Sequence, residues 1–255
     1  MRTVAAIDES TNATLALVRA ATVLDPQVEP CDNARTFYAA MPYVLGATGR
    51  PNTRDPFARS LTRAWRPRPS DALVAAINTA LVVLADHELA TSTLAARVAT
   101  SVRSAYPSTL AAALATVDGE LHGSASHYVH RLFATAHRVG PEEVLQQFRQ
   151  DRRRVPGFGH TIYRQRDPRV SLLLDRVRAL PDRGGRLATV EQLLRAAGSY
   201  VAQPPNVDLA LGALTFVADL PEQTPIFPVA RVAGWTAHHL EELEERPVRF
   251  RGLAR

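Results

Sequence analysis

The chain has 255 residues, of which 46% are hydrophobic, and its formal net charge is +5 at pH 7. This length supports one large domain or two smaller ones around a substantial core. All 30 basic residues are arginine, and the lack of lysine excludes the Schiff-base, pyridoxal phosphate and P-loop chemistries that need a lysine amine. The single cysteine, Cys31, excludes a disulfide framework and a cysteine-based zinc site, and it favours a reducing compartment, the cytoplasm.

The positive charge is spread along the whole chain, from Arg2 to Arg255, with no zinc-finger or RNA-binding signature to organise it. We therefore expect no nucleic-acid partner. Anionic small molecules are the expected ligands, because a guanidinium binds carboxylate or phosphate in a bidentate manner. Acidic residues precede any apolar run at the amino end, and no stretch reaches the ~18 apolar residues of a membrane span. The sequence predicts neither a signal peptide nor a membrane anchor.

Apolar residues recur at helical spacing in nearly every long segment, which predicts an almost entirely α-helical chain. In chain order, the predicted helices cover residues 13–24, 71–85, 91–103, 107–117, 126–138, 141–150, 168–180, 187–200, 208–219 and 226–243. One short additional helix, carrying Phe57, Leu61 and Trp65, is expected inside the loop-like segment 46–69. Alternating β patterns are scarce, and GFGH at 157–160 lacks the glycine spacing of a dinucleotide-binding loop.

Proline and glycine residues separate the predicted helices. Ser70-Asp71 and Gly140-Pro141 have the residue types of helix starts. The breakers between the periodic segments are Pro26, Pro30, Pro67, Pro69, Pro156, Pro181, Gly184, Gly185, Pro204 and Pro205. We find no internal repeat and no low-complexity linker.

Four segments depart from the pattern of ordinary helices, because each sets a histidine or an aspartate beside a helix boundary or a glycine. They are ADHELATSTLAAR (85–97), DGELHGSASH (118–127), VPGFGHTIYRQRDPR (155–169) and PPNVDLALG (204–212). Taken singly, each has a purely structural interpretation, either a buried histidine bonded to a backbone carbonyl or an aspartate at a helix N-cap.

Taken together, the order and local sequences of these segments resemble the citrate synthase family. There a DHE segment, an LHG segment, a PGxGH…DPR segment and an NVD segment follow one another. The resemblance continues into FPVARVAGWTAHHLEELEERPVRFRG (227–252), which is similar to the family's carboxy-terminal arginine, its GWxAHxxE helix and its RPxxxxxG tail. It covers roughly the last two-thirds of the chain, and the earlier third matches only loosely.

The resemblance implies an all-α, citrate synthase-like fold of two domains with the active site between them. On this basis we expect a large helical domain at 1–124 and 232–255, and a small domain at 125–231. The implied activity is an acyltransferase reaction that condenses acetyl-CoA with oxaloacetate to give citrate and CoA. No cofactor is expected, since the CoA thioester is itself a substrate.

This condensation needs a base for a weakly acidic C–H, a donor for the enolate oxygen and an acid for the ketone. By similarity, Asp208 removes the methyl proton, and His122 hydrogen-bonds the thioester carbonyl as a neutral imidazole. His160 polarises the oxaloacetate ketone and protonates the new alkoxide. An aspartate that acts on carbon is expected in a partly dry cleft, because burial raises its proton affinity.

The resemblance assigns Arg169, Arg231 and Arg246 to the two carboxylates of oxaloacetate, and His87 to its ketone end. Arg246 is the residue expected to reach across a dimer. For CoA, the implied binding residues are the loop Val155, Pro156, Gly157, Phe158 and Gly159, which presents backbone groups to the adenine, and Arg164, which meets a phosphate. The run Arg152, Arg153 and Arg154 has two open interpretations: a further phosphate contact or a solvated turn.

The other histidines do not predict a metal site. His238 and His239 are adjacent, so on a helix they point about 100° apart and cannot chelate one metal together. His127, His130 and His137 fit one helix, and without an acidic or cysteine partner they are interpreted as polar surface or core residues.

The departures from the family leave the activity open. Ala90 stands where most members have an asparagine, and Ser124, Ala125 and Ser126 stand where most have Gly-Ala-Asn. Relative to typical members the chain is short at its amino end, as in a natural short form, a split-gene subunit or a fragment. Three hypotheses follow: a synthase, a citryl-CoA lyase using the same site, and a non-catalytic or partner-dependent subunit. The RPVRFRG tail favours the synthase, and we expect a homodimer or a heterodimer with a homologous subunit.

Overall fold

The computed structural model describes residues 12–49, 52, 54–86, 88–119, 122–182 and 184–247. Over these residues it contains twelve α-helices and no β-strand, which confirms the predicted all-α class. The helices are α1 (Ala13–Thr22), α2 (Pro30–Val44), α3 (Phe57–Trp65), α4 (Asp71–Val83), α5 (Thr91–Ser101), α6 (Tyr106–Val117), α7 (Ala125–Val139), α8 (Pro141–Gln150), α9 (Pro168–Arg178), α10 (Arg186–Ala197), α11 (Val207–Val217) and α12 (Ile226–Glu244). Among the described helices, none has the length and apolarity needed to cross a membrane.

Helix α2 is the one that periodicity did not predict. The sequence pattern predicts Pro26 and Pro30 as helix breakers, but Pro30 is the first residue of α2, where its missing N–H costs no hydrogen bond. Pro42 lies within the last turn of the same helix and is buried. The other predicted helices correspond to α1 and α3–α12, and α4 and α8 begin at the predicted Ser70-Asp71 and Gly140-Pro141 signals.

The chain divides into two compact units. The first comprises the described residues up to Pro67, Leu81–Gly123 and the described residues from Pro225 onward; the second comprises Arg68–Ala80 and Ser124–Thr224. The predicted large domain differs from the first unit in three places, because it includes residues 68–80 and Ser124 and resumes at residue 232 rather than at Pro225.

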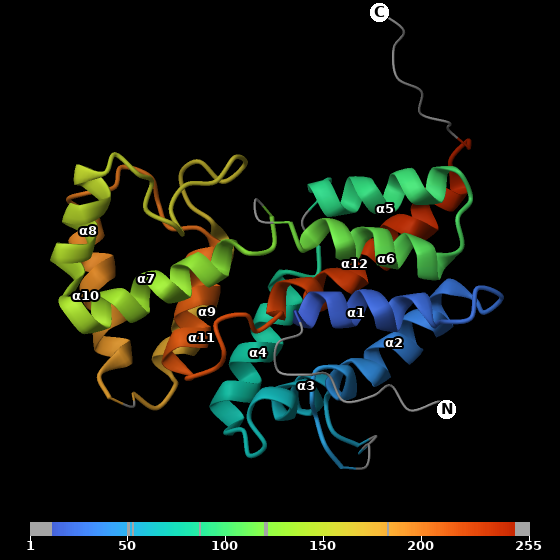
Figure 1. The fold of residues 1–255 in the computed structure, drawn as a ribbon, viewed down its shortest axis with the longest axis horizontal. Coiled ribbons are helices and arrows are strands. Elements are labelled where there is room, and N and C mark those ends of the chain that lie inside the picture. The colour runs from blue at the N-terminus through green and yellow to red at the C-terminus, as the bar shows by residue number, and fades with distance from the viewer. Residues whose placement is uncertain are drawn as a thin grey trace, which may run out of the picture. The chain divides into compact units, whose positions relative to one another are not determined.

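Helix α12 is central to the first unit, where it packs against α2, α5 and α6 (Figure 1). It carries Arg231 and Trp235, both with no exposed surface. Helix α1 packs on α6 and α2 with Leu17 fully buried, and α2 contributes Phe37 and Met41 to the same core. A guanidinium therefore lies fully buried in the core of the first unit.

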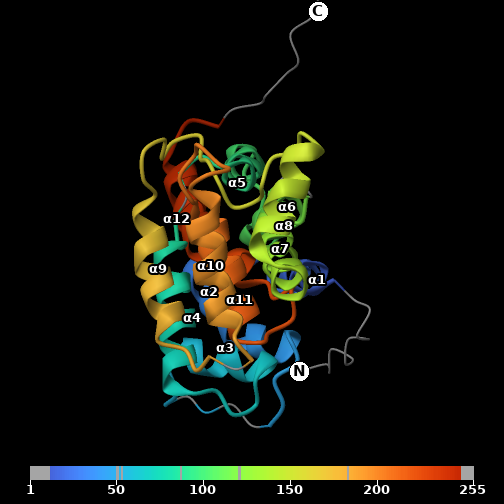
Figure 2. The ribbon, with the colours of Figure 1, turned by 90° about the vertical axis from the view of Figure 1, so that its left-hand side faces the viewer.

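Helix α11 has the same central position in the second unit, where it packs against α7, α9 and α10 (Figure 2). Every residue of α11 except Asp208 is buried. The Asn206 side chain caps the helix by accepting from the N–H groups of Asp208 and Leu209, at 3.0 and 3.3 Å. The sequence therefore places one carboxylate on the first turn of an otherwise apolar helix.

Close packing of α11 on α7 requires a glycine at position 212. A Cβ added to Gly212 would lie 2.6 Å from two carbon atoms of Val129 and 2.9 Å from the backbone N of His130. We predict that Gly212→Ala lowers the free energy of unfolding by about 1–3 kcal/mol, because overpacking outweighs the helix propensity that alanine gains. Urea denaturation followed by circular dichroism measures this change.

Gly198→Ala is the matched control, since Gly198 is exposed at the end of α10 with φ −55° and a Cβ there would meet only an ordinary contact at 3.5 Å. We expect that variant to stay within about 0.5 kcal/mol of the parent. Equal midpoints for the Gly212 and Gly198 variants would contradict the close-packing argument.

Candidate functional site

In the first unit, His122 lies in the turn before α7, where a glycine is needed next to it. The N–H of Gly123 donates to the Val117 carbonyl at 2.9 Å, and a Cβ on Gly123 would stand 2.3 Å from that carbonyl oxygen. The His122 ring contacts the Phe227 ring edge-on, with centroids 5.9 Å apart. The LHG glycine therefore lets the chain turn tightly enough to place the imidazole.

Ser92, the second residue of α5, decides which His122 nitrogen carries the proton. The Ser92 backbone N–H donates to His122 Nε2 at 3.3 Å, and the Ser92 hydroxyl lies 2.8 Å from the same nitrogen. A nitrogen that accepts from a backbone N–H carries no proton, so the proton of the neutral ring is on Nδ1. Burial lowers the pKa of His122, and the charge of Arg231 lowers it further. His122 is thus a neutral hydrogen-bond donor through Nδ1.

Arg231, on α12, is held by the segment that precedes α5 and by the first turn of α5. Its guanidinium donates to the Ala85 carbonyl at 2.9 Å, to the Thr93 hydroxyl at 2.8 Å and to the Asp86 carboxylate at 3.3 Å. A Cβ on Gly234 would lie 2.4 Å from the Ala85 oxygen, so the glycine of the GW pair allows this approach. Here Arg231 serves protein acceptors, and its role toward a substrate carboxylate stays a prediction.

In the second unit, the PGFGH loop is bonded along its length to the segment before α11. The Gly159 N–H donates to the Pro204 carbonyl at 2.8 Å, the Asn206 N–H donates to Gly157 at 2.9 Å, and the Asn206 amide donates to the Gly159 carbonyl at 2.8 Å. Gly157 has φ +86°, and a Cβ there would lie 2.9 Å from side-chain atoms of Leu209 and Val129. These contacts bring the residues that follow the loop to the start of α11.

His160 ends that loop, and two backbone groups hold its ring. Its Nδ1 accepts from the N–H groups of Ile162 and Tyr163, each at 3.1 Å, so the proton of the neutral ring is on Nε2. Burial and the charge of Arg169 lower the pKa of His160, against a smaller opposite effect of Asp167. Nη2 of Arg169 also approaches Nε2, but at 3.5 Å, so the two shorter bonds to Nδ1 determine the tautomer and the Nε2–H lies beside a cation.

Asp167, which sequence reasoning did not select as a site residue, connects the other groups. Its carboxylate accepts from Nε and Nη2 of Arg169 at 2.9 and 2.8 Å, and from the backbone N–H groups of Arg169 and Val207 at 3.1 and 3.0 Å. Burial alone would raise the pKa of Asp167, but the bonds and charge of Arg169, with the Val207 amide, hold it below its usual value. The DPR motif is the sequence feature that could have identified Asp167, because an aspartate at a helix N-cap can bind an arginine two residues later in a bidentate manner.

Asp208 follows Val207 on α11 and is the half-buried carboxylate of this cluster. Burial raises the pKa of Asp208 to about 6; the charge of Arg169 opposes that rise and the charge of Asp167 adds to it. The second unit therefore brings together three predicted site residues: His160, Arg169 and Asp208. It combines a basic carboxylate, a neutral imidazole donor and a cation.

The predicted CoA-binding residues and Arg246 lie at the surface or are partly exposed. Val155 to Gly159 are each partly exposed, and Arg164 and Arg246 are exposed, with Arg246 just beyond α12. His87 lies outside the described residues. His130 and His137 bond Thr215 and Thr189 at 2.9 and 2.7 Å.

The four residues that depart from the family pattern lie at the starts of two helices. Ala90 is the N-cap of α5 and Ser124 that of α7, and neither makes a side-chain capping bond. Ala125 and Ser126 are the first two residues of α7. Since alanine has no side-chain acceptor, the residue at position 90 cannot satisfy the first N–H groups of α5. With alanine at position 90, α5 therefore has no side-chain N-cap.

Comparison with known proteins assigns the family. Residues 10–251 match the model described as "Citrate synthase, C-terminal domain". The chain belongs to the citrate synthase family. The citrate synthase of Haloferax volcanii is 32% identical over 232 residues, which cover 84% of this chain and 61% of that protein. This citrate synthase family member thus spans less than two thirds of that relative's length.

Solved structures have the same fold as this family member. The citrate synthase of Thermoplasma acidophilum, in a ternary complex with carboxymethyl coenzyme A and oxaloacetate, superposes with a TM-score of 0.80 at 26% identity. The match covers 97% of this chain and 73% of that one. A citryl-CoA lyase from Hydrogenobacter thermophilus shares the fold with a TM-score of 0.69 at 24% identity, over 80% of this chain and 86% of the lyase.

The Asp167–Arg169 pair generates a stability prediction. Arg169 is 8% exposed and Asp167 is 1% exposed, so Asp167→Ala leaves a guanidinium buried without its carboxylate. We expect this variant to lose about 3–5 kcal/mol of unfolding free energy at pH 7, measured by urea denaturation. Because the folded pKa of Asp167 lies below its usual value, its contribution is present above about pH 4 and is lost as pH falls through the folded pKa.

The control for this prediction is Asp175→Ala, which removes a solvent-exposed partner of Arg178. It should change stability by less than about 1 kcal/mol. If Asp167→Ala proved as mild as Asp175→Ala, the interpretation of Asp167 as the central acceptor of the cluster would be wrong.

Proposed function

We propose that this chain condenses acetyl-CoA with oxaloacetate to give citrate and CoA. The observation that carries the proposal is the cluster of His160, Arg169 and Asp208 in a member of the citrate synthase family, with the pKa of Asp208 raised to about 6. A carboxylate with that pKa is a stronger base than an ordinary aspartate and is still ionised at neutral pH. Proton removal from carbon needs this combination.

In the first step, Asp208 takes a proton from the acetyl methyl group while His122 donates a hydrogen bond from Nδ1 to the thioester oxygen. The neutral state of His122 supports this role, because its Nε2 already accepts from Ser92. The enol carbon then attacks the ketone carbon of oxaloacetate, forming one C–C bond. His160 polarises the ketone through its Nε2–H and supplies the proton to the new alkoxide. Water then cleaves the citryl thioester and releases CoA with a free thiol.

Binding of oxaloacetate is proposed to use Arg169, Arg231 and Arg246, with His87 at the ketone end. Arg169 is the best supported of these by position, because Nη2 of its guanidinium lies 3.5 Å from Nε2 of His160. Arg231 would have to share its donors between a substrate carboxylate and its present acceptors, Asp86 and Thr93. Exposed Arg246 is proposed to serve a second subunit.

CoA is proposed to bind as a substrate along the loop from Val155 to Gly159, with Arg164 at a phosphate. Gly157 and Gly159 both have positive φ, at +86° and +83°, a conformation that glycine adopts freely and that lets a backbone loop pass close to a ligand. Assembly as a homodimer, or with a homologous subunit, is proposed together with the role of Arg246. The cytoplasm is the proposed location, since the single cysteine is exposed and unpaired.

The test mixes the purified full chain with acetyl-CoA and oxaloacetate and follows release of free thiol. We predict thiol release that falls ~100-fold or more in Asp208→Asn, because the variant keeps the shape of the side chain and removes the base. Exchange of the methyl protons into heavy water should be lost in the same variant. Asp175→Asn, on the surface of α9, is the control and should retain full activity.

Other outcomes discriminate between the hypotheses. Cleavage of citryl-CoA without condensation would replace the synthase by the lyase, which runs the same bond changes in reverse. No reaction in either direction for a folded chain that binds a homologous subunit would indicate a partner-dependent subunit. Unchanged methyl exchange in Asp208→Asn would contradict the assigned base.

The pKa of Asp208 also predicts a pH profile. The base acts only when ionised, so the rate constant for methyl exchange should be constant above about pH 7 and fall roughly tenfold per pH unit below about pH 6. The rate falls toward low pH because the raised pKa keeps the Asp208 carboxyl protonated, and therefore inactive as a base, at pH values where an ordinary aspartate is already ionised. A profile that stayed flat down to pH 4.5 would contradict the raised pKa.

A further inference from the structure

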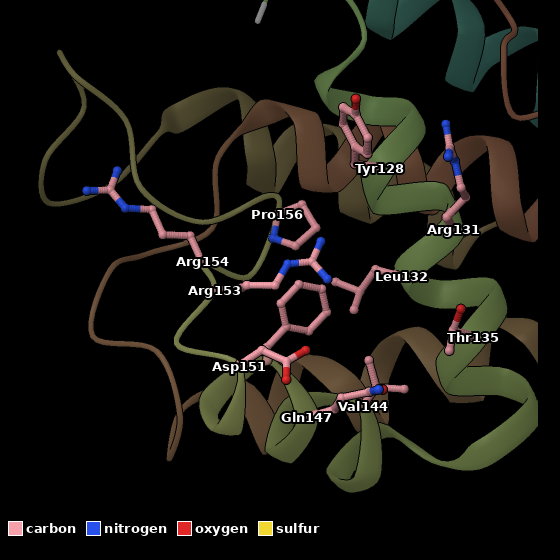
Figure 3. Close-up of a pocket in the computed structure, with 11 residues that line it drawn as sticks. Tyr128, Arg131, Leu132, Thr135, Val144, Gln147, Asp151, Arg153, Arg154 and Pro156 are labelled. Atoms are coloured by element: carbon pink, nitrogen blue, oxygen red, sulfur yellow. The ribbon is translucent and has the colours of Figure 1, made fainter. Parts of the chain in front are cut away.

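The pocket between α7, α8 and the loop to Pro156 has a volume of about 500 Å³ (Figure 3). The Arg153 guanidinium, which lines it, lies over the Phe148 ring, 5.3 Å from the ring centroid. Pro156 belongs both to this pocket and to the loop proposed to bind CoA, so the pocket is part of the proposed CoA site. The same loop continues through His160 to a segment that reaches Asp167.

Residues 161–166 form that segment, and Tyr163 is the exception among them. The five other residues are exposed, whereas Tyr163 is half-buried. Ile162 is purely apolar, and yet 57% of its surface is exposed. Apolar burial alone would favour Ile162 as the side chain that turns inward. The position of Tyr163 therefore needs a more specific cause.

A tight turn presents Tyr163 to His160. The Arg164 N–H donates to the Ile162 carbonyl at 3.0 Å, which closes a three-residue turn centred on Tyr163. The Tyr163 N–H donates to His160 Nδ1 at 3.1 Å. The backbone of Tyr163 thus bonds the same residue that its ring contacts.

The Tyr163 ring lies against two of the groups proposed to act on oxaloacetate. Its centroid is 5.1 Å from that of the His160 imidazole, and the two planes are inclined by 41°. The guanidinium carbon of Arg169 lies 4.9 Å from the same centroid. The negative face of an aromatic ring attracts a cation, and more strongly when the cation is desolvated, as Arg169 is at 8% exposure. One ring therefore contacts the donor and the cation together.

These contacts oppose two movements that the hydrogen bonds described above do not by themselves prevent. Asp167 accepts from Nε and Nη2 of Arg169, and this pair of bonds allows the guanidinium plane to tilt about the line through the two carboxylate oxygens. The backbone bonds of His160 meet at one atom, Nδ1, about which the imidazole can pivot. Either movement changes the 3.5 Å separation between Nη2 of Arg169 and Nε2 of His160.

We propose that Tyr163 is a positioning residue for oxaloacetate, whose ring holds the His160 donor and the Arg169 cation at a spacing that one substrate molecule spans. A 2-oxo acid carries a ketone and a carboxylate on adjacent carbons, so its recognition needs two donors side by side. The inference rests on the proposed function, in which His160 serves the ketone and Arg169 a carboxylate. Both contacts involve the ring, so the phenol hydroxyl is dispensable.

The experiment compares ring-free and ring-containing variants of the full chain. Tyr163→Leu and Tyr163→Met remove the ring and keep an apolar side chain, whereas Tyr163→Phe removes only the hydroxyl. Gln165→Ala, exposed on the same segment, is the matched control. Calorimetric titration with oxaloacetate should give a Kd that rises roughly 3- to 30-fold in the ring-free variants and stays within about twofold in Tyr163→Phe and Gln165→Ala. The KM for oxaloacetate should rise in parallel, and the KM for acetyl-CoA should not.

A second measurement needs neither substrate nor turnover. It follows the titration of His160 by NMR, with the resonance identified by its loss in His160→Ala. Burial and the charge of Arg169 lower the pKa of His160, and Asp167 opposes them. Without the ring, water enters and the guanidinium moves away, so the pKa of His160 should rise in the ring-free variants and not in Tyr163→Phe.

The outcomes separate this inference from the proposed function. Weaker oxaloacetate binding and a raised pKa of His160 in the ring-free variants, for a wild type that releases no thiol, would refute the proposed reaction and support the positioning role. An oxaloacetate Kd equal to that of the wild type in a folded ring-free variant overturns the proposal, because a ring that only stabilises the loop lowers the melting temperature alone. It is also overturned by a wild type that binds no oxaloacetate, or by a Tyr163→Phe variant as weak as Tyr163→Leu.

Discussion

The second unit depends on one buried carboxylate, that of Asp167, which accepts from two side-chain and two backbone N–H groups. Through Val207 it joins the start of α9 to the start of α11, and through Arg169 it fixes the cation beside His160. A buried carboxylate is tolerable only when hydrogen bonds and an opposite charge replace its water, and here both do so. The same bonds that stabilise the junction between the helices thus set the geometry around Asp208.

Both units position an imidazole in the same physical way. A backbone N–H donates to one ring nitrogen, from Ser92 to His122 and from Ile162 and Tyr163 to His160, and this leaves the proton on the other nitrogen. Arginine charge nearby favours the neutral ring in each case. Glycines allow the approach of the segments involved, because a side chain at Gly123 or Gly157 would collide with its neighbours. The result is a neutral, oriented hydrogen-bond donor in each unit.

The lack of lysine gives arginine every cationic role in the chain. Arg169 uses its planar fork on Asp167, Arg231 divides its donors among Ala85, Asp86 and Thr93, and the Arg153 guanidinium lies over the Phe148 ring. Each of these arrangements depends on a rigid, delocalised cation, and an ammonium group could not reproduce the bidentate or the stacked geometry. The two arginine-rich places in the second unit have different surroundings. Arg169 is buried and bonds a buried carboxylate, whereas Arg153 is exposed and lies over the Phe148 ring.

The sequence by itself determined the helical class, eleven of the twelve described helices and the chemical type of the site residues, because apolar periodicity, helix caps and short motifs are local properties. It missed α2, since Pro30 serves as a helix start and Pro42 is accommodated in the last turn. Only the tertiary structure decided that Ser92 holds His122, that Asp167 reaches Val207 and that Arg231 donates to the Ala85 carbonyl. The first two of these contacts join residues 30 and 40 positions apart. Contacts at that separation depend on how whole helices pack, which no local pattern of residues specifies.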